Sequence, residues 1–415
     1  MNRTDFSVNP KHVKLRTAAF LLALAIAVGA FTYAITGLGR KSAGIYEISA
    51  SRDEEAPFYQ SGVTFHYSFE GSSGAIKALT NEVSAAYGAS LKSAYILLDS
   101  ENVYDNRVNI ATLNRSIGQD VQVTPELFDI LTDACAKTQE NMGYNVFAGA
   151  LYKEWNSILI LLDPDDFDPT VNRDEAERIA ALTEVTNDLD NFSLEIVDRA
   201  SCTLRLNVSQ SYLDLLTELE IDPVILDLNL LRDAYKLSLL AADLEAGGYG
   251  DGYLVTDSGL FLSLSGFTGG EFCFNSSFAG APLPAALSPI HPSMAASQFR
   301  VFPYEEDEPY YYAIAEGEHT HYRHPYLPAS GTYPDVLTAS VCISPTGDLI
   351  GACYENIRLG ALTGADAVAA LAASDGDFLI GYTLQADTEK IVYANAQALT
   401  VLTPADYGYQ LQGLS

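Results

Sequence analysis

The chain has 415 residues, with 54 acidic side chains against 23 basic ones and a formal net charge of −31 at pH 7. This balance argues against nucleic acid as a partner, because phosphate binding needs a surplus of basic side chains. Hydrophobic residues make up 48% of the chain and aromatic residues 11%, which supports a packed core and argues against a disordered chain. The length allows either several domains or one mixed domain.

Residues 17–38 are uncharged and apolar. As a helix they would reach about 33 Å, enough to cross a bilayer core. Four basic side chains precede the segment and two follow it, so the positive-inside rule favours a cytoplasmic N-terminus (residues 1–16). We therefore predict a single-pass cell-membrane protein with an extracytoplasmic C-terminal body. The alternative is a secretory signal cleaved near residues 28–30, which also exports the body.

The elements of the first half are predicted in chain order. Residues 39–60 have low apolar content and are interpreted as a stalk. Residues 62–69 alternate as a strand, and residues 74–87 follow with a helical pattern. A second helix begins with Thr124 as its cap, Pro125 at its first position and Glu126 in its first turn, and ends at Gly143. A third covers residues 172–182 from a capping box.

The second half contains a helix over residues 230–246, with two glycines as its C-terminal signal. Strands are predicted at residues 253–255, 260–264, 271–274, 337–343, 378–384 and 390–393, with a helix at 365–373. The strands and helices interleave without a regular βαβ period. We therefore predict an α+β fold for a body spanning residues 61–394, followed by a tail at 395–415.

Cysteines and histidines are the residues best suited to bind a metal. The five cysteines are odd in number and lack the paired spacing of a zinc site, so we interpret them as buried small residues. His319, His321 and His324 are clustered, and alternation along a strand would place the first two on one side, where they could bind a metal. No third acidic or thiol ligand has obvious spacing to them. The alternative is a polar loop in which one histidine acts as an acid, a base or a phosphate contact.

Several segments resemble, in order and spacing, the motifs of the bacterial FAD:protein FMN transferases, the ApbE-type flavin transferases. They cover about two thirds of the chain and read LNR (113–115) with VTPELFDIL (123–131), GYNVFAGAL (143–151) with Trp155, LDLNLLRDAYKLSLLAADLEAGGY (226–249), LVTDSGLFLSLSG (254–266), AASQFRVF (295–302) and HYRHPYLPASGTYP (321–334). The resemblance implies an ApbE-type flavin transferase-like domain behind the N-terminal transmembrane helix.

The resemblance also implies a chemistry, in which Mg²⁺ assists cleavage of the FAD pyrophosphate and FMN passes to a Ser or Thr hydroxyl of a partner protein. His321 holds the position of the motif's histidine and is the candidate catalytic residue. The candidate flavin-binding residues carried over from the motifs are Tyr235, Asp257, Ser258, Gly259, Ser297 and His324. No residue is assigned as a metal ligand.

The differences from the motifs lie at positions to which the resemblance assigns chemical roles. An aspartate and a threonine of the first glycine motif become Asn145 and Phe147, and the lysine facing the FAD phosphates becomes Asp233. The aspartate of the histidine motif becomes His324. In the magnesium segment, Gly351 stands near the aspartate position and Glu355 near the threonine position. A hard cation needs several oxygen ligands, so these changes imply a weakened metal site.

We therefore expect a catalytically degenerate pseudoenzyme that acts as a binding or accessory component of membrane flavoprotein maturation. One alternative is an active Mg-dependent FAD:protein FMN transferase, with His321 contacting the flavin phosphate and Asp257, Asp348 or Glu355 aiding a cation. FAD is the ligand that both versions imply, and Mg²⁺ belongs to the active one. A third possibility is a stalked surface protein with no ligand.

Overall fold

The computed structural model describes residues 42–140, 142–158, 164–278, 281–302, 312–316, 319–323, 336–374, 376–395, 399–401 and 408–414. The predicted membrane segment and the predicted cleavage point near residues 28–30 lie outside these ranges, as does His324. In the part of the chain that is described, no helix has both the length and the apolar character needed to span a bilayer.

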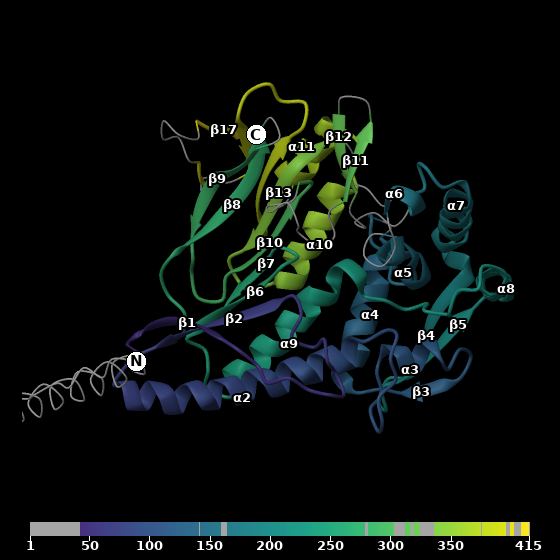
Figure 1. Ribbon diagram of the computed structural model, residues 1–415, viewed down its shortest axis with the longest axis horizontal. Coiled ribbons are helices and arrows are strands. Elements are labelled where there is room, and N and C mark those ends of the chain that lie inside the picture. Colours follow the sequence, from purple (N-terminus) through teal and green to yellow (C-terminus); the bar gives the residue numbers. More distant parts are fainter. Residues whose placement is uncertain are drawn as a thin grey trace, which may run out of the picture.

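A nine-stranded sheet with the order β1-β2-β6-β7-β10-β13-β14-β15-β17 forms the centre of the fold (Figure 1). Neighbouring strands are antiparallel, except that β15 and β17 are parallel. The strands are β1 (Gly44–Ile48), β2 (Val63–Phe69), β6 (Gly252–Thr256), β7 (Leu260–Ser263), β10 (Ala295–Arg300), β13 (Leu337–Ser344), β14 (Leu379–Leu384), β15 (Ile391–Ala394) and β17 (Gln410–Gly413).

One face of this sheet is covered by helices and the other by a second sheet (Figure 1). The helices are α2 (Ser73–Leu98), α9 (Arg232–Ala246), α10 (Leu349–Gly360) and α11 (Ala365–Ser374), with the short η4 (Asn229–Leu231) leading into α9. The second sheet has the order β16-β9-β8 and consists of β8 (Glu271–Phe278), β9 (Ala281–Pro289) and β16 (Thr400–Val401).

Strand β13 shows why both layers are needed, because all eight of its residues are buried. Ser340 faces the helices, where its hydroxyl donates to Asn356 Oδ1 at 2.5 Å. Val341 and Ile343 face the other way and share an apolar cluster with Phe274 of β8. A strand buried on both faces carries apolar or hydrogen-bonded residues at every position, as this one does.

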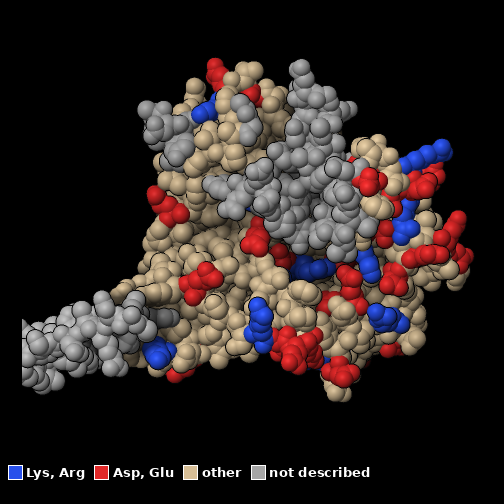
Figure 2. Space-filling model, in the orientation of Figure 1, with Lys and Arg blue, Asp and Glu red and all other residues tan. Residues whose placement is uncertain are grey.

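A separate lobe packs beside the helical layer and carries its own sheet, with the order β3-β5-β4 (Figure 1). On the face shown in Figure 2, Asp and Glu side chains crowd this lobe, with Lys and Arg side chains between them. Its elements are α3 (Ile110–Asn114), β3 (Asp120–Gln122), α4 (Pro125–Gln139), α5 (Gly149–Asn156), α6 (Pro164–Phe167), α7 (Arg173–Asn187), η3 (Leu189–Asn191), β4 (Phe192–Asp198), β5 (Thr203–Val208) and α8 (Gln210–Glu218). A two-stranded hairpin of β11 (Tyr312–Glu316) and β12 (His319–Arg323) belongs to neither large sheet.

The predicted α+β class is confirmed, and most predicted strands match their positions within a few residues. The predicted end of α4 is wrong, because the helix stops at Gln139 and Gly143 follows it with φ +85°. The first helix extends to Leu98 instead of residue 87, since its buried face continues through Leu91 and Ile96. α10 and the β3-β5-β4 sheet were not predicted at all.

Residues 44–60 also differ from the expected stalk. β1 pairs along its whole length with β2, and Ile48, Ala56 and Tyr59 are buried in the main core. The stalk was predicted from the low apolar content of this segment, but its few apolar residues pack into the core. At the other end, β17 pairs with β15, so residues 410–413 of the predicted tail also lie on the sheet.

Candidate functional site

Three residues carried over from the motifs, Ser258, Gly259 and Ser297, lie where α9, the β6–β7 turn, β10 and α10 come together. α9 packs on β7, and α10 packs on β10 and β13. Asp233 lies in the first turn of α9 and Ser258 in the β6–β7 turn. The side chains of these two residues are joined by a direct hydrogen bond, so the fold brings together two positions that are 25 residues apart.

Asp233 is held by donors on both of its carboxylate oxygens. Lys236 Nζ lies 2.7 Å from Oδ1, and the Ser258 hydroxyl donates to Oδ2 at 2.8 Å. The Lys236 side chain is 8% exposed and that of Asp233 28% exposed, so the pair is largely shielded from water. Burial opposes ionisation of Asp233, but Lys236, Ser258 and Arg232 outweigh it and lower the pKa of this carboxyl below its usual range. The site therefore holds a carboxylate ion.

The β6–β7 turn is itself fixed by hydrogen bonds. The hydroxyls of Thr256 and Ser258 lie 2.8 Å apart, and Thr256 Oγ1 accepts from the backbone N–H of Leu260 at 3.0 Å. Gly259 adopts φ +90°, and a Cβ there would come within 2.4 Å of the carbonyl oxygen of Gln298. Glycine is thus required at this position by both its backbone conformation and its packing.

A second ion pair, between the buried Asp227 and the partly exposed Arg232, lies at the start of α9. Asp227 accepts from the guanidinium of Arg232, from the Ser100 hydroxyl at 2.5 Å and from the backbone of Asn229. Asn114 binds the adjacent backbone, accepting from the N–H of Leu226 at 2.8 Å and donating to its carbonyl at 2.9 Å. These bonds fix the entry into α9 and hence the position of its first turn.

Behind the site, Asn356 of α10 ties the helix to the sheet. Its amide donates to the carbonyl and to the hydroxyl oxygen of Ser297 at 3.0 and 3.2 Å. Ser297 is 4% exposed, so its hydroxyl is part of the internal network. Next to it, burial raises the pKa of the Cys353 thiol to about 12, and this thiol donates weakly to the Leu230 carbonyl. Cys353 is therefore a neutral thiol at physiological pH.

Two of the three carboxylates considered for a cation are engaged in other contacts. Asp348 caps α10 by accepting from the backbone N–H of Gly351 at 2.8 Å, and Glu355 pairs with Arg358 at 2.5 Å. These two positions are seven residues apart on α10, about 10 Å along its axis. In the described residues, no group of three or more His, Cys, Asp or Glu side chains is arranged to hold a metal ion. Asp348 and Glu355 therefore do not form a Mg²⁺ site together.

The remaining predicted residues are distributed differently. Tyr235 is 2% exposed and its hydroxyl donates to Asp133 Oδ2 at 2.6 Å, so its ring lies in the core. Asp257 is exposed in the β6–β7 turn next to Ser258. His321 lies in β12 opposite Ile314 of β11.

The residues of the first glycine motif also have a structural role. The Asn145 amide donates to the Thr186 carbonyl at 3.0 Å, and the Phe147 ring stacks on Phe192 with centroids 5.2 Å apart. The two substituted positions thus pack the lobe. Trp155 is 1% exposed and anchors α5 in the core.

Sequence reasoning missed Lys236, Asp227, Arg232 and Asn356. Lys236 follows Asp233 by three residues on a helix, which is the spacing of an ion pair and was a usable signal. The bonds from Asn356 to Ser297 join residues 59 positions apart and have no sequence signal.

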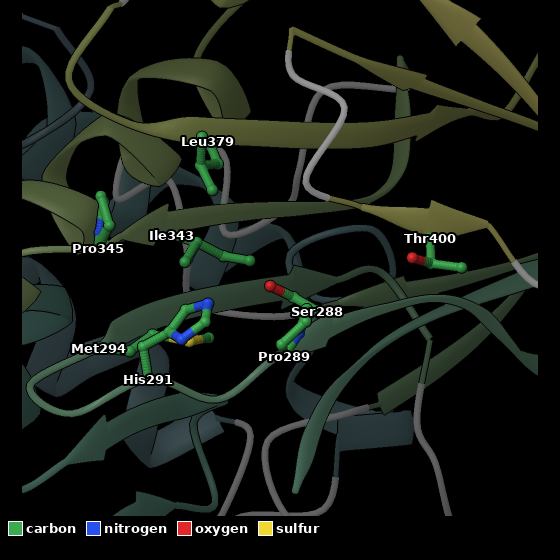
Figure 3. Close-up of a pocket in the computed structure, with 8 residues that line it drawn as sticks. All are labelled: Ser288, Pro289, His291, Met294, Ile343, Pro345, Leu379 and Thr400. Carbon is green, nitrogen blue, oxygen red and sulfur yellow. The ribbon is translucent and has the colours of Figure 1, made fainter. Parts of the chain in front are cut away.

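Two cavities lie away from this cluster. One, of about 320 Å³, opens between the two sheets, and Figure 3 shows Ser288, His291 and Ile343 around the same space. It is lined by Ser288, Pro289, His291, Met294, Ile343, Pro345, Leu379 and Thr400. The other, of about 490 Å³, lies beside the end of α2 and is lined by Glu55, Pro57, Phe58, Tyr95, Asn102, Val103, Tyr104 and Asp105. Of the predicted site residues whose side chains are described, none lines either cavity.

No protein-family model matches the sequence, and no curated protein is significantly similar to it. Solved structures do match. The ApbE protein of Thermotoga maritima MSB8 gives a TM-score of 0.53 at 13% identity, covering 82% of this chain and 94% of that one. The flavin transferase ApbE of Vibrio cholerae gives 0.54 at 13% identity, covering 83% and 95%. Pseudomonas stutzeri flavinyl transferase ApbE in its apo form gives 0.52 at 14% identity, covering 87% and 94%.

These matches define the fold class. Over most of its length the chain has the fold of the ApbE flavin transferases, which confirms the resemblance drawn from the motifs.

Proposed function

We propose that this protein is a membrane-anchored, extracytoplasmic relative of the ApbE flavin transferases that does not cleave FAD. In this proposal it acts as a binding or accessory component in the maturation of membrane flavoproteins. The observation that carries the proposal is the ion pair of Asp233, which stands where the resemblance has a lysine facing the FAD phosphates. The anchoring rests on the apolar residues 17–38.

The physical reason is charge. Cleavage of a pyrophosphate depends on neutralising the charge that develops on its oxygens. A carboxylate about 4 Å from a phosphate oxygen would instead add roughly 4 kcal/mol of repulsion at an effective dielectric constant near 20. Two of the three carboxylates considered for a cation, Asp348 and Glu355, are already used as a helix cap and as an arginine partner. Both effects disfavour the reaction.

One observation favours the alternative, an active Mg-dependent FAD:protein FMN transferase. Lys236 places a positive charge one helical turn beyond the motif's lysine position. In that alternative, His321 contacts the flavin phosphate and the FMN acceptor is a Ser or Thr of a partner protein.

The test is to titrate the full-length protein with FAD, with and without Mg²⁺, and to follow both flavin fluorescence and the release of AMP. The proposal predicts no magnesium-dependent quenching and no AMP. Magnesium-dependent binding with steady AMP release would overturn it in favour of the transferase. In that event, His321→Ala should abolish turnover, and unchanged turnover would remove His321 from the assigned role.

A further inference from the structure

We propose that Lys236 and Ser258 form a binding site for a phosphate-type oxyanion, and that the protein's own Asp233 carboxylate occupies it in the folded state. The inference rests on the proposed function, because it explains how the site is kept from external ligands. It goes further in assigning the donors, the class of ligand and the residue that excludes it.

The donors surround Asp233 as they would surround an oxyanion. Each carboxylate oxygen has its own donor, an ammonium at 2.7 Å on one and a hydroxyl at 2.8 Å on the other. Charge-assisted bonds of this kind hold phosphate groups as well as carboxylates. Ser258 is positioned independently of Asp233, through the hydroxyl of Thr256 at 2.8 Å. Removing the carboxylate would therefore leave the Ser258 hydroxyl in place beside the buried Lys236 ammonium.

The surroundings also favour a negative charge. Asp233 lies in the first turn of the 15-residue helix α9, and the residue before this helix makes no side-chain cap. The short helix η4 leads directly into α9, and the backbone N–H of Arg232 donates to the Asn229 carbonyl, so the positive charge near Asp233 comes from side chains. The ammonium of Lys236 and the guanidinium of Arg232 both favour a negative charge there. Lys236 is almost completely buried, so an ammonium left without a partner there is unfavourable.

The site is reachable from solvent. Ser258 is exposed in its turn, and 28% of the Asp233 side chain is accessible. A free oxyanion must nevertheless compete with a carboxylate tethered within the same helix turn. Such an intramolecular competitor has a high effective concentration, so the wild-type protein should bind oxyanions weakly.

The experiment uses thermal unfolding of the full-length protein and its Asp233→Ala variant, with inorganic pyrophosphate as the probe and no divalent cation. We expect the variant to unfold about 3 °C below the wild type, because Lys236 loses its partner. Millimolar pyrophosphate should raise the Tm of the variant toward that of the wild type. The fitted Kd for pyrophosphate should be at least about ten-fold lower in the variant than in the wild type.

Asp243→Ala is a matched control on the same helix. The carboxylate of Asp243 accepts the Ser90 hydroxyl at 2.6 Å but has no ion pair in the described structure, so pyrophosphate should not restore this variant. The double variant Asp233→Ala/Lys236→Met lacks the cation and should also fail to respond. Asp233→Asn keeps the side-chain volume and should bind pyrophosphate more tightly than the wild type even if Asp233→Ala does not fold.

The outcomes separate this inference from the proposed function. If neither Asp233 variant responds to pyrophosphate, or if Asp243→Ala responds equally, the oxyanion site is refuted while an FAD-inert wild type leaves the proposed function standing. If the wild type turns over FAD with Mg²⁺, the proposed function is refuted whatever the variants do.

Discussion

The hydroxyl of Tyr235 donates to Asp133 Oδ2 at 2.6 Å and thereby ties α9 to α4 across 102 residues of sequence. Asp133 also pairs with Lys137 at 2.7 Å, so the tyrosine completes a small polar network at the border between the helical layer and the lobe. Burial and the adjacent carboxylate raise the pKa of Tyr235 far above its usual range. Its hydroxyl therefore remains a donor at any physiological pH.

Replacing Tyr235 by Phe should lower the free energy of unfolding by about 1–2 kcal/mol, because a hydrogen bond to a charged acceptor is lost while the ring still fills the core. Urea denaturation measures this change. Any flavin affinity of the full-length protein should stay the same, since the hydroxyl faces Asp133. A loss of flavin binding without a loss of stability would instead support the ligand role that the motif implies for Tyr235.

The ion pair of Asp233 predicts a specific dependence on pH. The pKa of this carboxyl is lower in the folded protein than its ordinary value of 3.8, so its contribution to stability is complete well above pH 3.8 and declines as the pH falls through that value and below it. Asp233→Asn lacks this contribution. The difference in urea midpoint between wild type and variant should therefore be constant from pH 6 to pH 7 and shrink below about pH 4. A difference that grows in acid would contradict the assignment.

Thiol reactivity should differ sharply between cysteines. Cys353 is 5% exposed and burial raises its pKa to about 12, so almost no thiolate is present at pH 8. Cys202, in a turn of the lobe, is only partly buried. We expect iodoacetamide to label Cys202 at least about ten-fold faster than Cys353. Equal rates in the folded protein would contradict the packing of α10, and equal rates in urea serve as the control.

Two glycines with similar backbone angles allow the cost of backbone strain to be measured apart from the cost of a steric clash. Gly259 has φ +90° and a Cβ there would meet the Gln298 carbonyl oxygen at 2.4 Å, whereas Gly269 has φ +95° with no atom within 4 Å of the same position. Gly269→Ala should cost about 1 kcal/mol from backbone strain alone. Gly259→Ala should cost at least about 2 kcal/mol more, because the turn that carries Ser258 must also move. Denaturant midpoints of the two variants test this ranking.

The elements predicted well from sequence are those whose signals are local. β2 alternates along its whole length, and Thr124 caps α4 through a bond to the Leu127 N–H, as the Thr-Pro-Glu start indicates. α10 was missed because nine of its twelve residues are buried, which removes the one-sided periodicity that marks a helix. β1 was missed because its buried residue, Ile48, is an exception in a mostly exposed strand.

In the candidate site, too, local contacts could be predicted from the sequence and long-range contacts could not. The pairing of Asp233 with Lys236 is a local helix spacing and was accessible from sequence. The contact of Ser258 with Asp233 depends on the crossing of α9 over the β6–β7 turn, and no local pattern encodes it. The substitutions at Asn145 and Phe147 were visible, but their use in packing the lobe required the position of Phe192.

The outermost strands of the nine-stranded sheet come from opposite ends of the described chain, β1 at one edge and β17 at the other. Each covers the pairing groups of a neighbour that would otherwise offer a template for foreign strands. Removing the residues before 60 would therefore uncover the edge of β2, and removing those after 400 would uncover the edge of β15. Either truncation should favour self-association of the shortened body. Recombinant forms should keep both terminal strands if they are to remain monodisperse.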